Sequence, residues 1–391
     1  MPHPARHSAN STGPDRLLLP RYWRRIVQSA LSRANIMING DRPWDMQVKD
    51  ERIFRRVVLY GSLGLGESYM DGDWDARQLD EFFFRLLHAR IHQHWFDIVK
   101  QLQRLQTILF NRQALSRAFQ VGKKHYDMDD DFFRAMLGER MVYTCAYWKN
   151  ADNLDEAQEQ KLDLVCRKLK LRPDQTVLDI GCGWGSFARF AAENYGARVT
   201  GITISKSQAE YAREMCKDLP VEIRLQDYRL VDDQFDHIVS LGMFEHVGRK
   251  NYRQFMEVAR RCLKDDEGIF LLHTIGKEDT SQHTDPWIGK YIFPNGEIPA
   301  LQYLIQSCDD LFVLEDLHNF GADYDKTLMS WYSNFNTNWE KFKPDYGQHF
   351  YRMWKYYLNC CAGAFRSRNL QLWQLVLTRE GLLSGYQRPS M

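Results

Sequence analysis

The sequence contains no run of eighteen apolar residues, the length that an α-helix needs to cross a bilayer. Its first sixteen residues are polar and lack the apolar stretch of a secretory signal peptide. These absences argue against a membrane-spanning or exported protein, so we expect a cytoplasmic one. The eight cysteines form no CxxC pair and no metal-finger spacing, which favours reduced thiols and no metal site.

The charges are distributed unevenly along the 391 residues. Residues 1–124 hold 20 Lys and Arg against 12 Asp and Glu, whereas the remainder holds 32 against 39. The N-terminal part, residues 1–124, is thus basic and the remainder is acidic. We expect this N-terminal part, called the front below, to contact an anionic partner. The length and the 44% content of hydrophobic residues are typical of two packed units.

A basic amphipathic helix is predicted in the stretch 21–38. Its apolar face would comprise Trp23, Ile26, Val27, Ala30, Leu31 and Ala34. Arg21, Arg24, Arg25 and Arg33 lie elsewhere around the helix. Two compatible interpretations are open: the apolar face docks on its own domain, or the helix contacts an anionic membrane surface.

Helical patterning continues to about residue 120, and an alternation of strands and helices begins near residue 155. We predict a flexible N-terminus at 1–16 and a small helical domain that engages lipid at 17–120. A catalytic domain would follow at 121–382, with a flexible C-terminus at 383–391.

Five apolar segments are expected to form strands: TVLDIG, RVTGITI, VEIRLQD, FDHIVSLG and GIFLLHTIG. Strands this apolar are buried on both faces, and helices between them predict an α/β fold with a parallel, doubly wound sheet. Ligands bind at the carboxyl ends of such strands. Five strand ends should therefore converge: Gly181 to Gly185, Thr203 to Ser205, Asp227 to Arg229, Glu245 with His246, and His273 to Ile275.

The stretch VLDIGCGWGS places Gly181, Gly183 and Gly185 between a strand and a helix, with Asp179 just before them. Glycines at this spacing let the backbone approach a ligand, although a tight structural turn is an alternative. A dinucleotide site would favour GxGxxG and an acid after the second strand, and neither is present. The pattern resembles motif I of class I S-adenosylmethionine-dependent methyltransferases, with Ser205 or Gln208 in place of the missing ribose acid.

A closer resemblance rests on eleven ordered segments between about residues 20 and 379. They are GSLGLGESYMDGDW, HYD, CAYWKNADNLDEAQEQKL, VLDIGCGWG, GITIS, QDYR, GMFEHVG, FLLHTIG, DPWIGKYIFPNGEIP, HNFGADYDKTL and NCCAGAFRSRNLQLWQ. Together they resemble the bacterial cyclopropane-fatty-acyl-phospholipid synthases.

This resemblance implies methyl transfer from S-adenosylmethionine to the cis double bond of an acyl chain in a phospholipid. A bound bicarbonate would then remove a proton so that the ring closes. The residues implied around that ion are Glu245, His273, the backbone of Ile275, Tyr324 and Cys145. Glu245 would orient the ion rather than act as the base, which accounts for an acid at a strand end. Cys145 and Cys361 are expected to line the site or pack, and His246 to be structural.

The resemblance also implies a cofactor site. Tyr143 and Thr144 would lie near the methionine end, Gly181 and Gly183 beneath it, Thr203 and Gln208 near the ribose, and Gln226 and Asp227 near the adenine. Asp179 and Gly185 complete the expected cofactor-binding set. As partners it implies unsaturated phospholipid in an anionic bilayer and a second copy of the chain, but no nucleic acid. The protein would associate peripherally with the inner face of the membrane.

Alternatives remain open. A related lipid C-methyltransferase would methylate the chain without closing a ring, and a small-molecule N-methyltransferase would share motif I but need no amphipathic front. A catalytically silent lipid-binding protein would lack a reason to keep the complete site. A metal site built from Glu245, His246, His273 and His318 is conceivable, but methyl transfer needs no metal.

Overall fold

The computed structural model describes residues 15–91, 130–264, 267–280 and 284–390. Its main sheet has seven strands in the order β5-β4-β3-β6-β7-β9-β8. Their bounds are β3 Thr176–Ile180, β4 Arg198–Thr203, β5 Val221–Leu225, β6 His237–Leu241, β7 Ile269–Lys277, β8 Val313–Asn319 and β9 Leu370–Thr378. Strands β3 to β7 pair in parallel, which confirms the five predicted strands and the α/β class.

Two strands depart from the predicted all-parallel sheet. Strand β9 runs antiparallel to both β7 and β8, so one edge of the sheet is antiparallel. The prediction missed both strands: β9, LQLWQLVLT, is apolar and mostly buried, whereas β8, VLEDLHN, is an acidic edge strand that is only half buried. Edge strands with one solvated side lack the continuous apolar run that marks a buried parallel strand.

Helices cover both faces of the sheet. Alternate strand residues face opposite layers: Val177 and Leu271 contact the core under one face, while Leu178 and Leu272 contact the core under the other. Helices α8 Leu154–Lys168 and α9 Ser186–Tyr195 cover the first face. Helices α11 Tyr252–Cys262 and α13 Leu301–Cys308 cover the second. Helix α10 Lys206–Met215 packs beside β4 and β5.

The front of the chain is helical, with α1 Asp15–Arg33, α2 Arg52–Met70 and α3 Leu79–His88. A two-stranded ribbon, β1 Gln47–Val48 with β2 Trp74–Asp75, completes it. The apolar face of α1 is buried through Val27 and Leu31, with Ala34 just after the helix, and α1 packs on α2, as the docking interpretation predicts. None of the described helices is long and apolar enough to cross a membrane.

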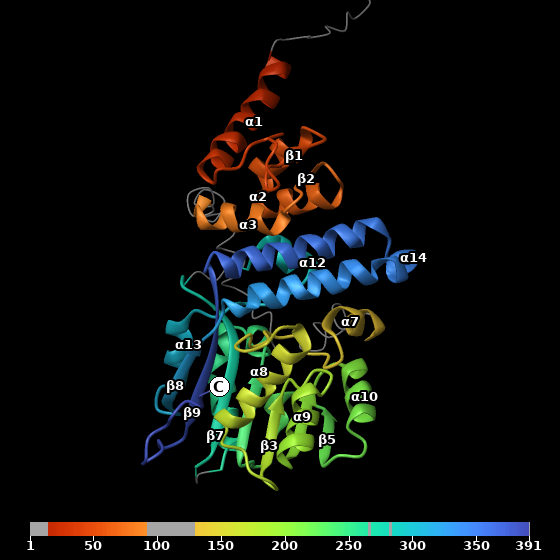
Figure 1. Cartoon of the computed structure of the whole chain (residues 1–391). Coiled ribbons are helices and arrows are strands. Elements are labelled where there is room, and N and C mark those ends of the chain that lie inside the picture. Colours follow the sequence, from red (N-terminus) through yellow and green to blue (C-terminus); the bar gives the residue numbers. More distant parts are fainter. Residues whose placement is uncertain (1–14, 92–129, 265–266, 281–283, 391) are drawn as a thin grey trace, which may run out of the picture.

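Helix α14 Asp323–Arg366 joins the front to the sheet. It breaks at Gly347, whose φ of 72° and ψ of 171° are non-helical, and its two arms run back along each other between the front helices and the sheet (Figure 1). One continuous core contains residues of α1, α2 and α3 together with α14 and α7 Asp130–Leu137. The front helices therefore share their core with the second arm of α14.

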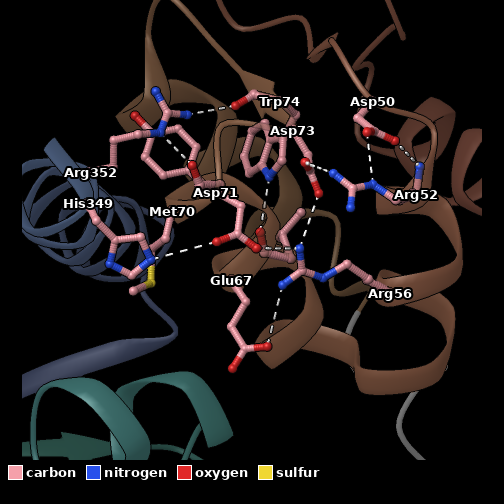
Figure 2. Close-up of polar contacts among 12 residues, drawn as sticks. Asp50, Arg52, Arg56, Glu67, Met70, Asp71, Asp73, Trp74, His349 and Arg352 are labelled. Carbon is pink, nitrogen blue, oxygen red and sulfur yellow. Dashed lines mark hydrogen bonds and ion pairs between the residues drawn. The ribbon is translucent and has the colours of Figure 1, made fainter.

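Polar contacts fix the front to α14 (Figure 2). Arg352 of α14 donates to the carbonyls of Tyr69 and Trp74 and to Asp75, at 2.5, 2.8 and 3.0 Å, and its guanidinium lies 3.9 Å from the Tyr69 ring centroid. His349 lies 3.7 Å from Asp71. Helix α12 Pro286–Tyr291 adds a second link, because Lys290 and Tyr291 both donate to Glu67.

The end of the chain, predicted to be flexible, also makes defined contacts. The Tyr386 hydroxyl donates to the Lys168 carbonyl at 3.0 Å, and the Arg388 guanidinium pairs with both carboxylate oxygens of Asp316.

Replacing Arg352 with Met should lower the free energy of unfolding by about 2 kcal/mol, because two carbonyls and a carboxylate lose their donor. Urea unfolding followed by tryptophan fluorescence would measure the change. Arg52→Met is the matched control, since this side chain is 74% exposed and its pairs with Asp50 and Asp73 should contribute less than about 1 kcal/mol. Equal losses in the two variants would contradict the assigned role of Arg352.

Candidate functional site

A cavity of about 190 Å³ opens at the carboxyl ends of the parallel strands. Gly181 and Gly183 line it in left-handed conformations, with φ of 85° and 55°. A Cβ at Gly183 would meet no atom within 4 Å, so this backbone faces open space. A Cβ at Gly181 would lie 2.7 Å from the Met243 side chain. The glycine loop thus presents bare backbone to a ligand.

The predicted cofactor residues gather around this cavity. Its lining includes Tyr143, Thr144, Asp179, Gly181, Gly183, Thr203, Gln208, Gln226 and Asp227. Gly185 does not line the cavity: it precedes α9, and a Cβ there would lie 3.0 Å from the Cβ of Ala212. It therefore permits the close packing of α9 against α10.

Three of the four residues predicted near the ribose and the adenine make side-chain contacts within the protein. The Thr203 hydroxyl and the Gln208 side-chain oxygen lie 3.1 Å apart. Both carboxylate oxygens of Asp227 accept from Arg229, at 2.8 and 2.7 Å. Arg229 was predicted at one of the converging strand ends but without a role in the cofactor site, and it also lines the cavity.

A second cavity of about 460 Å³ is mostly apolar and lies between the front helices and the catalytic part of the chain. Its walls come from α1, α2 and α3 on one side and from α12, α14 and the end of β7 on the other. Glu245, Ile275, Tyr324 and Cys361 line it. The position of this cavity could not be predicted from local patterns, because residues such as Leu31, Phe83 and Tyr356 meet only through tertiary packing.

The two cavities adjoin. Tyr143, Thr144, Gly242 and His246 line both of them. A ligand group in the polar cavity and a chain in the apolar cavity would therefore meet beside these four residues, which we call the junction. His246, expected to be structural, is among them, and burial lowers its pKa to about 4, so the imidazole is neutral.

Glu245 lies in the short helix η2 Phe244–His246 just past β6. Its Oε1 accepts the Ile275 backbone N–H at 2.6 Å, whereas its Oε2 is buried with no hydrogen-bond partner. Burial raises the pKa of Glu245 to about 7, although the Ile275 N–H opposes that rise. The Ile275 amide, expected to hold an ion, is thus occupied by the glutamate itself.

His273, on the neighbouring strand β7, is also buried and lines neither cavity. Its Nδ1 lies 3.1 Å from the Gln374 side-chain nitrogen, and its Nε2 has no hydrogen-bond partner. When the Gln374 amide donates to Nδ1, Nε2 carries the proton and is a donor. Burial holds the pKa of His273 well below its ordinary value, so the ring is neutral.

Tyr324 and the cysteines complete the predicted set. The Tyr324 ring stacks on Phe365 with centroids 4.3 Å apart and faces the apolar cavity. Cys145 is fully buried, donates to the Ala146 carbonyl and lines neither cavity, and burial raises its thiol pKa well above the ordinary value. Such a thiol is a poor nucleophile, in keeping with a packing role. Within the described residues, no cluster of acids, histidines or cysteines could hold a metal ion.

Comparisons with known proteins agree with this architecture. Residues 113–375 match the family model of mycolic acid cyclopropane synthetase. The chain is 53% identical over 358 residues to the cyclopropane-fatty-acyl-phospholipid synthase of Escherichia coli K12, covering 91% of this chain and 94% of that one.

Two solved structures share the fold of this chain. The mycolic acid cyclopropane synthase CmaA1, solved with SAH and CTAB, aligns with a TM-score of 0.63 at 31% identity, covering 67% of this chain and 98% of its own. Coclaurine N-methyltransferase, at 21% identity, has a TM-score of 0.67 and covers 81% of this chain and 99% of its own. The predicted class I methyltransferase fold is confirmed. The chain therefore belongs to the mycolic acid cyclopropane synthetase family.

Proposed function

We propose that this chain transfers the methyl group of S-adenosylmethionine to the cis double bond of an unsaturated phospholipid acyl chain and closes a cyclopropane ring. The observation that carries the proposal is the junction, where a polar cavity at the strand ends adjoins an apolar cavity. Few reactions need a charged cofactor and a hydrocarbon chain side by side. The relationship to a cyclopropane-fatty-acyl-phospholipid synthase supports the same substrate class.

The polar cavity fits S-adenosylmethionine. Bare backbone at Gly181 and Gly183 allows close approach, and Asp179, Thr203, Gln208 and Asp227 supply polar groups along the wall. When bound, this cofactor supplies an electrophilic methyl group on a sulfonium. The chain's task is to point that methyl group toward Thr144 and Gly242, where the apolar cavity begins.

The apolar cavity accounts for the chemistry of the alkene. An alkene carbon attacks the methyl group, so a new C–C bond forms, the S–CH3 bond breaks and positive charge develops on the acyl chain. Tyr143, Phe293 and Tyr324 line this space with rings, whose faces attract cations and do not attack them. Loss of a proton from the transferred methyl group then leaves an electron pair that closes the ring.

We assign the proton-accepting region to the buried groups beside the junction. Glu245 Oε2 and His273 Nε2 each have unused hydrogen-bonding capacity, one as an acceptor and one as a donor. Bicarbonate has a hydroxyl to donate to the first and oxygens to accept from the second, so these residues fit that ion. It would supply the base, while Glu245 and His273 orient it and Tyr324 limits access from the apolar side.

The contact with the membrane is assigned to the front helices. Arg21, Arg25 and Arg33 are exposed on α1, and Leu59 and Tyr60 of α2 are 42% and 59% exposed. The apolar cavity is lined from the same helices by Val27, Ala30 and Val57. A chain leaving an anionic bilayer would therefore enter between α1 and α2. Binding would be peripheral, at the inner face of the membrane, and a dimer would engage the surface through two such fronts.

The proposed activity is tested by mass spectrometry of vesicle lipids after incubation with the protein and S-adenosylmethionine. Vesicles of unsaturated phospholipid should gain one CH2 per modified chain and lose the double bond. Saturated vesicles are the control and should remain unchanged. A gain of CH2 with the double bond retained would support the C-methyltransferase alternative, and methylation of soluble amines without lipid modification would support the small-molecule one.

Glu245→Gln should lower turnover by about 100-fold or more, because the amide cannot accept and orient a donor as the carboxylate does. Affinity for S-adenosylmethionine should change less than about threefold, since Glu245 does not line the cofactor cavity. Turnover on vesicles and calorimetric binding would measure both. Normal turnover of the unaltered protein in bicarbonate-depleted buffer would contradict the assignment of the ion.

Arg21, Arg25 and Arg33 replaced together by Gln should weaken binding to anionic vesicles, by about 1 kcal/mol per charge near the surface. The salt dependence of binding should also flatten. Arg24 is left in place because it pairs with Glu51 at 2.6 Å. The triple replacement of Arg198, Lys206 and Lys217, exposed on the catalytic part, removes the same charge and should leave binding unchanged. Equal effects of both triples in a vesicle co-sedimentation assay would contradict a specific role for α1.

A further inference from the structure

Lys161 is a buried lysine that faces the cofactor cavity. It lies in the middle of α8, is 1% exposed, and lines the cavity beside Thr144 and Asp179. Its Nζ donates to the Thr144 hydroxyl at 3.0 Å. An ammonium has three protons to donate, and burying one without an anionic partner is costly. In the described part of the chain, Lys161 forms no ion pair, so an anionic group of a ligand in the cavity would supply the missing partner.

Asp179 is the oppositely charged group of the same cavity. Asp179 is the penultimate residue of β3 and is 1% exposed. Burial raises the pKa of Asp179, and the charge of nearby Lys161 opposes that rise. The two groups nevertheless make no salt bridge among the described residues. A cation and an anion that face one cavity without pairing directly are complementary to a zwitterion placed between them.

The amino-acid end of S-adenosylmethionine is such a zwitterion. We infer that Lys161 binds the α-carboxylate of the cofactor and that Asp179 receives its α-ammonium. This inference rests on the proposed function, because it assumes that the polar cavity holds this cofactor. Lys161 is then a positioning residue: it anchors the amino-acid chain of the cofactor, which is attached to the same sulfonium as the methyl group.

The hydrogen bond to Thr144 gives this anchor a second consequence. Thr144 lines both cavities, and a Cβ on neighbouring Gly242 would lie 2.6 Å from its Cγ2. The Lys161 ammonium would thus hold both the cofactor carboxylate and Thr144, which forms one wall of the junction. Binding of the amino-acid end therefore aligns the methyl group with the space where the acyl chain enters.

The test compares two ligands that differ only in the carboxylate: S-adenosylmethionine and its decarboxylated form, which keeps the sulfonium and the amine. Calorimetry on the full chain should find that the unaltered protein prefers the carboxylated ligand by at least about tenfold. Lys161→Met should abolish most of that preference, because it lowers the affinity for S-adenosylmethionine. The affinity for the decarboxylated ligand should change less than about twofold. Lys161→Arg, which keeps the charge, should retain a preference.

Lys168→Met is the matched control. Lys168 is a second fully buried lysine on α8, but its Nζ lies 3.1 Å from His318 Nδ1 and it does not line the cofactor cavity. It should leave the preference between the two ligands unchanged.

If Lys161→Met lowered the affinity for both ligands equally, Lys161 would have only a structural role, and the inference would be overturned. The absence of a preference in the unaltered protein would overturn it without any variant. Failure of the unaltered protein to bind either ligand would instead overturn the proposed function.

Discussion

The parallel pairing of β6 with β7 brings together the two residues, Glu245 and His273, to which we assign the binding of the ion. Leu241 lies opposite His273, and the Gly242 N–H continues the ladder beyond β6 by donating to the His273 carbonyl at 2.9 Å. Glu245 then reaches the Ile275 N–H across the same strand ends. The ladder bonds and the Ile275 N–H thus place the carboxylate and the imidazole at two paired, buried strands.

The other parts of the structure fit around this pair. The glycine loop after β3 provides the polar cavity on one side, while α14 and the front helices enclose the apolar cavity on the other. Arg352 contacts Tyr69, Trp74 and Asp75 and so joins the front of the chain to α14, which lines the apolar cavity. Burial also changes the protonation of Glu245 and His273: it raises the pKa of Glu245 to about 7 and keeps the His273 ring neutral.

Much of the strand-end site could be predicted from the sequence. Glu245 follows an apolar run, whereas Asp179 and His273 lie inside the apolar runs of β3 and β7. Such runs are local patterns, and parallel strands bring their carboxyl ends to one edge. The apolar cavity could not be predicted, because its walls combine segments more than two hundred residues apart. Lys161 was missed because a lysine in a helix is normally exposed. Its spacing from Ala157 and Leu164, both fully buried, was the available signal.

The most direct test of the account is the fate of the transferred methyl hydrogens. The protein would be incubated with S-adenosylmethionine carrying a CD3 group and vesicles of unsaturated phospholipid, and the modified chains analysed by mass spectrometry. Ring closure by loss of a proton from the transferred methyl group predicts two retained deuterium atoms and no double bond. Retention of three deuterium atoms would mean that the proton is lost from the acyl chain, and it would contradict cyclopropane formation at the junction.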